Sequence, residues 1–357
     1  MRILVIALLK ESQVRYKLEP LSMSPTVERL YLIRKSPGPA IPKLEYLLLP
    51  FVCKWRPFYL IMAPLYAIFF AWTKKVDFIL AYHLIPHGVF AFIASLVTGK
   101  PFIYSQIDMD IQNYTRNKFL KKLIVVFLKK AAFINVPGSN SKKFWINLGI
   151  SEEKINILHS TIDTENGFFP TNGEKDYDFI YVGELSPRKR VDLVIAAIKK
   201  LIDLGDNAKL AIIGDGPSKA ELMEQVKRLN ISNRVFFLGY QKHIRHFLNR
   251  SRIFVLISEN EGLPCALMEA MSCGLLAVAS NVSDIPDVLI DGETGFIVDE
   301  EQPDSVFQVL RMAWERYEDS YSIRRKSRDK IIAEHSYQAA VNKWSVVLKK
   351  MRVIVKK

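Results

Sequence analysis

The chain has 357 residues, 49% of them hydrophobic and 24% charged, which excludes a disordered or low-complexity protein and fits two folded domains. Its three cysteines, Cys53, Cys265 and Cys273, show no metal-type pairing and are expected to be small apolar residues in a reducing compartment. The net charge of +13 is concentrated in residues 1–170, which hold 22 basic against 11 acidic residues, and in residues 320–357, so we expect an anionic partner.

Short apolar strands alternate with helical segments in the first half. The expected strands are Ile3–Leu8, Leu30–Ile33, Asp77–Ala81, Phe102–Ser105, Phe133–Val136 and Ile155–Leu158. Lys10 and Glu11 end the first apolar run too early for a signal peptide, so we expect a cytoplasmic protein.

Three segments bear on the anionic partner. The apolar run Pro57–Trp72 is 16 residues long and is broken by Pro64, which favours a buried or interfacial helix over a membrane span. Segment Asn117–Lys130 combines an apolar stripe with lysines, and the tail Lys343–Lys357 has a similar pattern. Such helices bind membrane surfaces in the plane, although the stripe could equally pack on the sheet. Anionic lipid is favoured over nucleic acid, because neither a basic–aromatic RNA motif nor a helix-turn-helix pattern occurs.

The second half alternates strands and helices more regularly. The expected strands are Asp178–Gly183, Leu210–Gly214, Val235–Leu238, Ile253–Ile257 and Leu275–Ala279, with helices through Val191–Ile202, through Leu222–Leu229 and from about Cys265. This alternation predicts parallel sheets covered on both faces, with ligands at the carboxyl ends of the strands.

The polar stretch Thr164–Asp176 is the expected hinge. We therefore predict two doubly wound, Rossmann-like domains over residues 1–166 and 167–335 that face each other across a cleft, and a final helix over residues 336–357 that packs back on the first domain.

Segment Ser258–Met271 carries the most chemical information. It follows a buried strand, turns at Gly262, Leu263 and Pro264, and enters a helix, with Glu261 before the turn and Glu269 about one turn into the helix. Carboxylates can accept hydrogen bonds from the vicinal hydroxyls of a ribose or hexose. The helix N-terminus between them suits a diphosphate. Either glutamate alone could equally be a solvated side chain.

This segment resembles the E-x7-E motif of the family 4 retaining glycosyltransferases, which have the GT-B fold. The resemblance extends to Asp178–Ile195, Ile212–Pro217, Phe237–Tyr240 and Asp291–Phe296. It implies that Glu269 holds the ribose of a nucleotide-sugar donor, that Glu261 contacts the donor sugar, and that amides near Leu267 hold the diphosphate.

By the same resemblance, Lys189 matches the lysine of the Gly-Arg-Leu-x-x-x-Lys-Gly loop and would stabilise the leaving diphosphate. Gly183, Gly262, Leu263 and Tyr240 would line the donor site. The family's arginine after Gly183 is replaced by Glu184, and either Arg188 or Arg190 could compensate, unless both belong to a solvated basic turn.

The acceptor side departs further from the family. The histidine of a His-Gly-x-Asp pattern is replaced by Ile107, leaving Asp108 and Asp110; His87, after a strand, is an acceptor-side candidate or simply a helix-start residue. His83 and His87 have no third ligand beside them in the sequence, so no metal site is predicted.

The predicted function is transfer of a sugar from a nucleotide-sugar, with no other cofactor, to a lipid-linked or saccharide acceptor in polysaccharide or glycolipid synthesis at the inner membrane face. Another GT-B enzyme, such as a nucleotide-sugar epimerase or a phosphorylase, and an inactive membrane-binding homologue remain open.

Overall fold

The structure, a computed structural model, describes all residues except 108–113, 116 and 357. It contains two compact units, one formed by Met1–Thr161 with Tyr337–Lys357 and the other by Ile162–Ser336. The polar stretch Thr164–Asp176, expected to be a hinge, lies in the second unit. There the amide of Thr171 donates to Asn249 Oδ1 at 2.7 Å. The chain therefore passes between the units earlier than the sequence suggested, because these polar residues find hydrogen-bond partners in the second unit.

The first unit is built on a parallel sheet with the order β3-β2-β1-β4-β5-β6-β7 over the described residues. Its strands are β1 (Arg2–Ile6), β2 (Arg29–Arg34), β3 (Leu44–Leu48), β4 (Phe78–Tyr82), β5 (Phe102–Ser105), β6 (Phe133–Val136) and β7 (Ile155–Ile157). The predicted strands are present, with small shifts at their ends. Strand β3 was not predicted. It is a short edge strand, and its pairing with β2 depends on the rest of the sheet.

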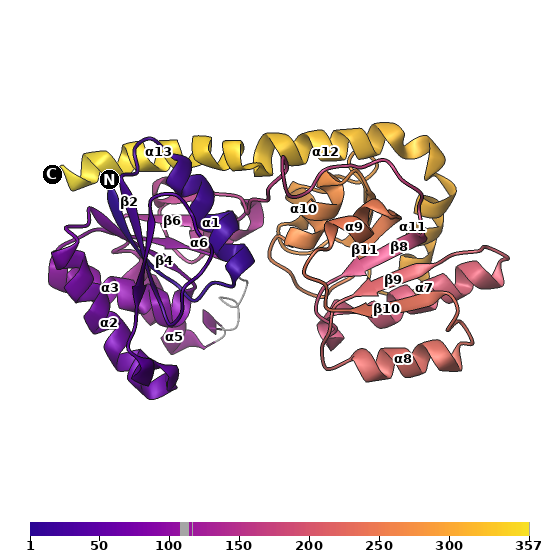
Figure 1. Cartoon of the computed structure of the whole chain (residues 1–357), viewed down its shortest axis with the longest axis horizontal. Coiled ribbons are helices and arrows are strands. Elements are labelled where there is room, and N and C mark those ends of the chain that lie inside the picture. Colours follow the sequence, from indigo (N-terminus) through magenta and orange to yellow (C-terminus); the bar gives the residue numbers. More distant parts are fainter. Residues whose placement is uncertain (108–113, 116, 357) are drawn as a thin grey trace. The chain divides into compact units, whose positions relative to one another are not determined.

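Helices cover both faces of this sheet (Figure 1). They are α1 (Glu11–Met23), η1 (Phe51–Lys54), α2 (Arg56–Thr73), η2 (Leu84–Gly88), α3 (Val89–Thr98), α5 (Lys118–Leu128), α6 (Ser139–Asn147), η3 (Glu152–Lys154) and α13 (Tyr337–Val355). One face carries α2, α3, α5 and α6, and the other carries α1 and α13. Trp344, Leu348 and Met351 of α13 are buried against the second of these faces, so much of the apolar pattern of the tail serves packing.

The basic helix α5 divides its apolar side chains between two environments. Ile124, Phe127 and Leu128 are buried, whereas Phe119 and Leu123 are exposed. The packing alternative therefore holds for the second half of the stripe, and the first half remains available to a partner. Among the described residues, no helix is both long enough and apolar enough to cross a membrane.

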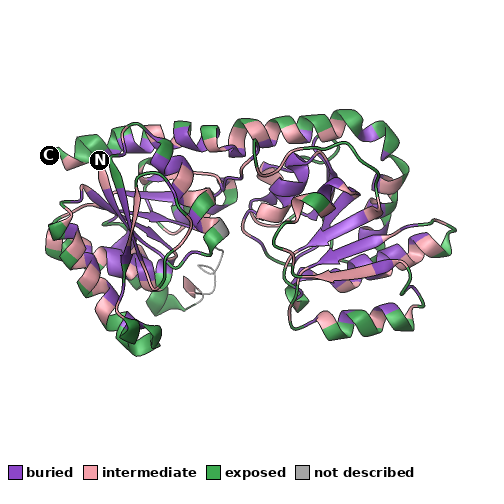
Figure 2. Ribbon diagram, viewed as in Figure 1, coloured by how far each residue is buried: buried purple, intermediate pink, exposed green. Residues whose placement is uncertain are grey.

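The second unit repeats the same strand order, β10-β9-β8-β11-β12-β13, in the region described. Its strands are β8 (Tyr177–Val182), β9 (Leu210–Ile213), β10 (Val235–Gly239), β11 (Ser251–Leu256), β12 (Leu276–Ser280) and β13 (Phe296–Val298). Its helices are η4 (Pro187–Lys189), α7 (Val191–Asp203), α8 (Lys219–Arg228), α9 (Arg245–Asn249), α10 (Cys265–Ser272), η5 (Ile285–Asp287), α11 (Pro303–Glu315), η6 (Glu318–Ser320) and α12 (Tyr321–His335). Figure 2 shows the central strands buried, the edge strand β10 mostly intermediate and the outer helix faces exposed, as expected of a doubly wound sheet. The prediction of two such sheets is confirmed.

Candidate active site

The second sheet has a point where its strand order reverses. Strand β8 lies between β9 and β11, so the helices that follow β8 and β11 leave the sheet on opposite sides of this point. In doubly wound sheets, ligands bind beside the carboxyl ends of the strands at such a switch point. The loops that follow β8 and β11 contain Lys189 and Glu261, respectively. Two residues singled out in the sequence therefore lie where the topology places a ligand.

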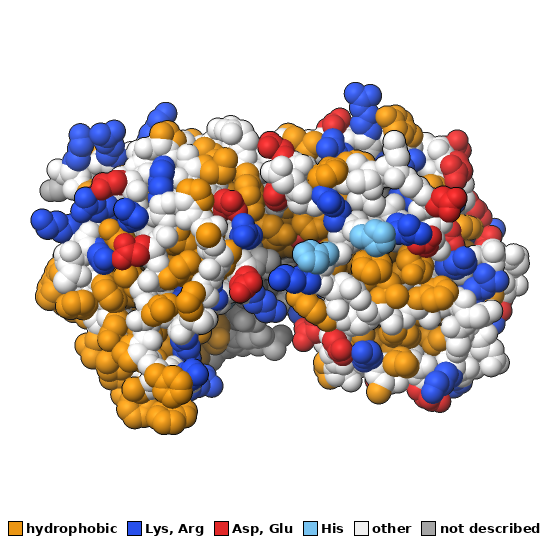
Figure 3. Space-filling model, viewed as in Figure 1, with side chains coloured by type: hydrophobic (Ala, Val, Ile, Leu, Met, Phe, Trp, Pro, Cys, Tyr) orange, Lys and Arg blue, Asp and Glu red, His pale blue; other side chains and the backbone are white. Residues whose placement is uncertain are grey.

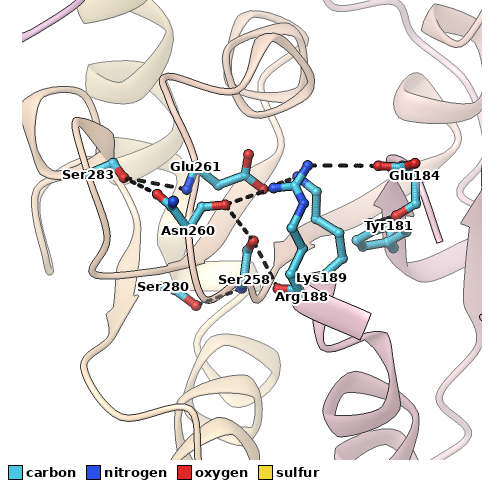
Figure 4. A network of polar contacts seen from close by, with 9 residues as sticks. All are labelled: Tyr181, Glu184, Arg188, Lys189, Ser258, Asn260, Glu261, Ser280 and Ser283. Atoms are coloured by element: carbon cyan, nitrogen blue, oxygen red, sulfur yellow. Dashed lines mark hydrogen bonds and ion pairs between the residues drawn. The ribbon is translucent and has the colours of Figure 1, made fainter. Parts of the chain in front are cut away.

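The structure pairs these two residues directly. Lys189 Nζ donates to Glu261 Oε1, and the two side chains are only 9% and 8% exposed (Figure 4). Burying a charge is costly unless an opposite charge accompanies it. The pair therefore holds a cation and a carboxylate in fixed positions, each compensated by the other until a ligand competes for them.

A hydrogen-bond network ties the two loops together (Figure 4). The backbone oxygen of Arg188 accepts from Glu259 N at 2.9 Å and from Ser258 Oγ at 3.2 Å. Ser283 Oγ donates to Asn260 Oδ1 at 3.1 Å. Sequence reasoning did not single out Ser258, Asn260 or Ser283. Ser258 could have been noticed, because it is a polar residue directly after a buried strand.

The arginines of the first loop have partners within the loops. Arg188 Nη1 donates to the backbone oxygen of Asn260 at 2.9 Å, and its Nη2 lies 3.8 Å from Glu184 Oε2. Arg190 lies near the carboxylates of Asp192 and Glu259. Arg188 therefore borders the Lys189–Glu261 pair, whereas Arg190 is engaged by two acidic groups.

Tyr181 supports the first loop from beneath. Its hydroxyl donates to the backbone oxygen of Glu184 at 2.8 Å, and burial, with the charge of Glu261 adding to it, raises the pKa of this phenol. A Cβ at Gly183 would lie only 2.8 Å from Tyr181 Oη. A side chain at Gly183 would therefore require the Tyr181 ring to shift.

The loop after β9 packs even more closely on this turn. Gly214 has φ of +143°, and a Cβ there would lie 1.8 Å from the backbone oxygen of Gly183. Its amide donates to the backbone oxygen of Gly239 at the end of β10. Tyr240 follows, with a side chain that is 79% exposed. The ends of three neighbouring strands thus meet at this edge, and Tyr240 offers an uncovered ring beside them.

Helix α10 begins directly after the second loop. Its N-cap Pro264 provides no side-chain cap, and amides in the first turn of a helix lack intrahelical acceptors, so an anion is favoured there. The side chains of Leu263 and Leu267 are buried in the core, which leaves only their backbones for a ligand. Gly262 follows Glu261 in the loop that leads to the first residue of α10.

Glu269 lies further along α10, about 6 Å from its first residue at 1.5 Å per residue, and is 6% exposed. Burial, followed by the charge of Glu269, raises the pKa of Cys273 to about 12. This thiol is therefore protonated at neutral pH, which argues against Cys273 as a nucleophile.

The first sheet carries histidines at its own switch point, after β4. His87 is buried, and its Nε2 lies 2.8 Å from Tyr59 Oη. Burial, followed by the charge of His83, lowers the pKa of His87 to about 3. His87 is therefore a neutral imidazole packed in the unit. Asp108 and Asp110, the other acceptor-side candidates, lie outside the described residues.

This geometry agrees with a comparison with known families. Residues 163–330 match the family described as Glycosyl transferases group 1. The second unit therefore belongs to this family. The chain is 28% identical over 239 residues to N-acetyl-alpha-D-glucosaminyl L-malate synthase from Bacillus anthracis, an alignment that covers 64% of the chain and 62% of the synthase.

Two further likenesses extend over more of the chain. The chain is 25% identical over 307 residues to a UDP-Gal:alpha-D-GlcNAc-diphosphoundecaprenol alpha-1,3-galactosyltransferase from Escherichia coli, with 78% of each protein covered. The solved structure of HepE from Anabaena in complex with UDP-glucose matches with a TM-score of 0.79 and 17% identity, covering 98% of this chain and 99% of HepE. This second likeness shows the fold, which is GT-B. The chain spans 62% of the length of the Bacillus anthracis synthase and 63% and 57% of the lengths of two other curated relatives.

Proposed function

We propose that this chain is a retaining glycosyltransferase that moves a sugar from a nucleotide-sugar donor to a lipid-linked or saccharide acceptor in cell-surface polysaccharide or glycolipid synthesis. The observation that carries the proposal is the buried Lys189–Glu261 pair at the switch point of the second sheet. Family membership and the printed activities of the relatives support the reaction class.

In the proposed reaction, the diphosphate leaving group is the part that most needs stabilisation by the protein. The bond between C1 of the sugar and the diphosphate oxygen breaks, and its electron pair leaves with the diphosphate. The acceptor oxygen forms the new bond to C1, and its proton passes to the departing diphosphate oxygen. Lys189, Arg188 and the first amides of α10, at Leu267 and the residues before it, stabilise the charge that grows on the diphosphate. With these positive groups in place, no metal or other cofactor is proposed.

The proposed roles of the other donor-site residues follow from their positions in the loops and in α10. Glu261, at the end of the β11 loop, accepts hydrogen bonds from hydroxyls of the transferred sugar, and Glu269 accepts those of the ribose. Gly183 and Gly262 let the backbone approach the donor, Leu263 contributes its backbone, and Tyr240 covers the base. On the acceptor side we retain His87 and Asp110 as candidates. His87 would act as a neutral hydrogen-bonding group, because burial lowers its pKa to about 3.

A lipid-linked acceptor would bring the protein to the inner face of a membrane as a peripheral protein. The printed name of the Escherichia coli relative includes an acceptor on diphosphoundecaprenol. In this chain, exposed Phe119 and Leu123 of α5 lie in sequence beside the exposed lysines Lys118, Lys121 and Lys122. Such a pattern suits an anionic lipid surface.

The first test is a thermal-shift screen of the purified protein against UDP, GDP, ADP and their sugar conjugates. Selective stabilisation by one nucleotide, lost in Glu269→Gln, is expected. NMR of the product formed with lipid-linked acceptors then reports the anomeric configuration. An inverted product would contradict retention, a changed free nucleotide-sugar would indicate an epimerase, and absence of any nucleotide binding would overturn the donor site.

A further inference from the structure

Helix α2 buries a stripe of alanines and exposes many of its large side chains, although Tyr59 is buried. Ala63, Ala67 and Ala71, spaced four residues apart on one stripe, are fully buried where the helix meets α3 and the sheet. A surface helix of a globular protein normally directs its large apolar residues to the core and polar residues to water. On α2 this arrangement is partly inverted, because the outer face is apolar rather than polar, and packing within the unit does not explain that face.

The outer face forms a continuous run along η1 and α2. We use the term apolar surface for the exposed side chains Phe51, Trp55, Ile61, Leu65, Phe69 and Trp72. Figure 3 shows hydrophobic side chains gathered at the lower left, over the segment labelled α2 in Figure 1. Leu96 of the neighbouring helix α3 is also exposed, at 66%. Large contiguous exposed apolar areas mark interaction sites.

The end of this surface at η1 is aromatic. Phe51 is 74% exposed and Trp55 is 63% exposed, and the rings of Trp55 and Phe58 have centroids 6.0 Å apart. Tryptophan has an apolar ring system with one polar N–H, and it is favoured at the boundary between hydrocarbon and water. The composition of this end therefore suits a lipid interface.

The segment that forms the apolar surface carries only basic charges. From Tyr46 to Val76 the sequence has four basic residues and no acidic residue, and residues 117–151 add seven lysines, again with no acidic residue. Lys54, Arg56 and Lys75 are exposed, whereas Lys74 is paired with Glu45 at 2.7 Å. Lys54 Nζ lies 4.1 Å from the centroid of the Phe51 ring. A positive charge therefore lies directly beside an exposed aromatic side chain.

These charges indicate which partner the apolar surface contacts. In a symmetric dimer the same patch faces its copy, which would set Lys54 and Arg56 against like charges. An anionic bilayer satisfies the apolar and the basic side chains together. We propose that the apolar surface docks on an anionic lipid bilayer, with α2 lying in the plane of the headgroup region. The inference deepens, and rests on, the membrane location in the proposed function; it identifies η1 and α2 as the contact.

The test is flotation of the full chain with vesicles of phosphatidylcholine and phosphatidylglycerol in a 70:30 ratio, with pure phosphatidylcholine for comparison. The wild-type chain is expected to float with the anionic vesicles. The double variant Phe51→Ser, Trp55→Ser is expected to lose at least tenfold in partitioning. A matched control, Leu204→Ser with Tyr321→Ser, removes two similarly exposed apolar residues of the second unit and is expected to bind as wild type.

The in-plane orientation has its own measurement. Trp55 and Trp72 lie at opposite ends of α2, about 25 Å apart at 1.5 Å per residue. Lipids brominated in their acyl chains are expected to quench Trp72 in the Trp55→Phe variant and Trp55 in the Trp72→Phe variant. Quenching of Trp55 alone would overturn the in-plane orientation.

Three outcomes would overturn the proposal. They are absence of flotation of the wild type, unchanged flotation of the Phe51→Ser, Trp55→Ser variant, and a concentration-dependent dimer in sedimentation that this variant abolishes. The nucleotide thermal shift, measured without vesicles, separates this inference from the proposed function. Nucleotide binding without flotation would refute the membrane contact alone, and flotation without nucleotide binding would refute the donor site alone.

Discussion

The two sheets of this protein share one strand order but differ in what covers them. In the second sheet, α7 buries large residues such as Val194, Ile195 and Ile198, as an ordinary surface helix does. In the first sheet, α2 buries alanines and exposes large apolar residues. The strand order is shared, so it does not account for the difference.

The carboxyl ends of the strands differ as well. At the switch point of the second sheet, Lys189 and Glu261 form a buried charged pair. At the corresponding point of the first sheet, His87 is neutral and hydrogen-bonded to Tyr59. Strand order fixes where a site can be, whereas the side chains decide whether it suits a charged leaving group or an uncharged hydroxyl.

The largest expected effect concerns the charged pair. Lys189→Met should lower kcat by about 10²- to 10³-fold, because it removes a fixed positive group from the leaving diphosphate. The measurement is steady-state transfer with the nucleotide-sugar identified by thermal shift. Lys200→Met, at an exposed lysine paired with Asp304, should leave kcat unchanged.

Lys189→Met also leaves Glu261 buried without its partner, which is destabilising in itself. The double variant Lys189→Met, Glu261→Gln removes the uncompensated charge together with a proposed donor contact. Its melting temperature should recover while its activity stays low. Activity that recovers with the melting temperature would show that the lysine serves only the fold.

The next effect concerns the loops of the second sheet. Gly214→Ala should destabilise the second unit by about 3 kcal/mol or more, because its Cβ would collide with the backbone oxygen of Gly183. Gly292→Ala, also at positive φ but with open space around it, should cost only about 1 kcal/mol. Hydrogen exchange should rise in β8 and β9 and stay unchanged in β1 and β4. Equal effects of the two substitutions would refute the close approach.

A pH effect is expected in the first unit. Burial lowers the pKa of His87 to about 3, below the value of 6.5 for an unperturbed histidine. The unfolded chain therefore binds a proton more readily, so this stability is fully present above pH 6.5 and falls as the pH decreases from about 6.5 towards 3. The loss should be about 2 kcal/mol between pH 7 and pH 5, at 1.36 kcal/mol per pKa unit.

The measurement is urea unfolding of the wild type and of His87→Gln at both pH values. The variant should lose about 2 kcal/mol less than the wild type on acidification. His243→Gln, at an exposed histidine of the second unit, should follow the wild type. Parallel losses in all three proteins would show that His87 is not held neutral.

The smallest expected effect tests the inverted packing of α2. Ala67→Leu should destabilise the first unit by at least about 1 kcal/mol, because the buried stripe has no room for a larger side chain. Leu65→Ala, two residues away on the exposed face, should change stability by less than about 0.5 kcal/mol. Thermal unfolding of both variants measures these changes. A larger loss of stability in Leu65→Ala than in Ala67→Leu would show that the apolar outer face serves the fold.

Much of the fold was predictable from local pattern. The strands that lie between two others, such as β1, β4, β8 and β11, are apolar throughout because both faces of a parallel sheet are covered, and the sequence shows them directly. Strands β3 and β13 were missed. Both are short and lie at sheet edges, so neighbouring strands, rather than their own composition, define them.

The candidate site was only partly visible. The positions of Glu261 and Lys189 follow from their places after strands and from family resemblance, but they are 72 residues apart in the chain. Their contact depends on β8 and β11 being neighbours, which no local pattern specifies. The serines and Asn260 that tie the loops together escaped notice for the same reason.

The sequence by itself determined the two doubly wound sheets, the place of the donor motif after a strand, and the excess of positive charge in the first half. These depend on residue type and short-range spacing, which act through local conformation and burial. Only the tertiary structure decided that Lys189 and Glu261 meet, that α5 buries half of its stripe, and that α2 exposes its large side chains. These depend on which elements become neighbours, and that is set by packing between segments far apart in the chain.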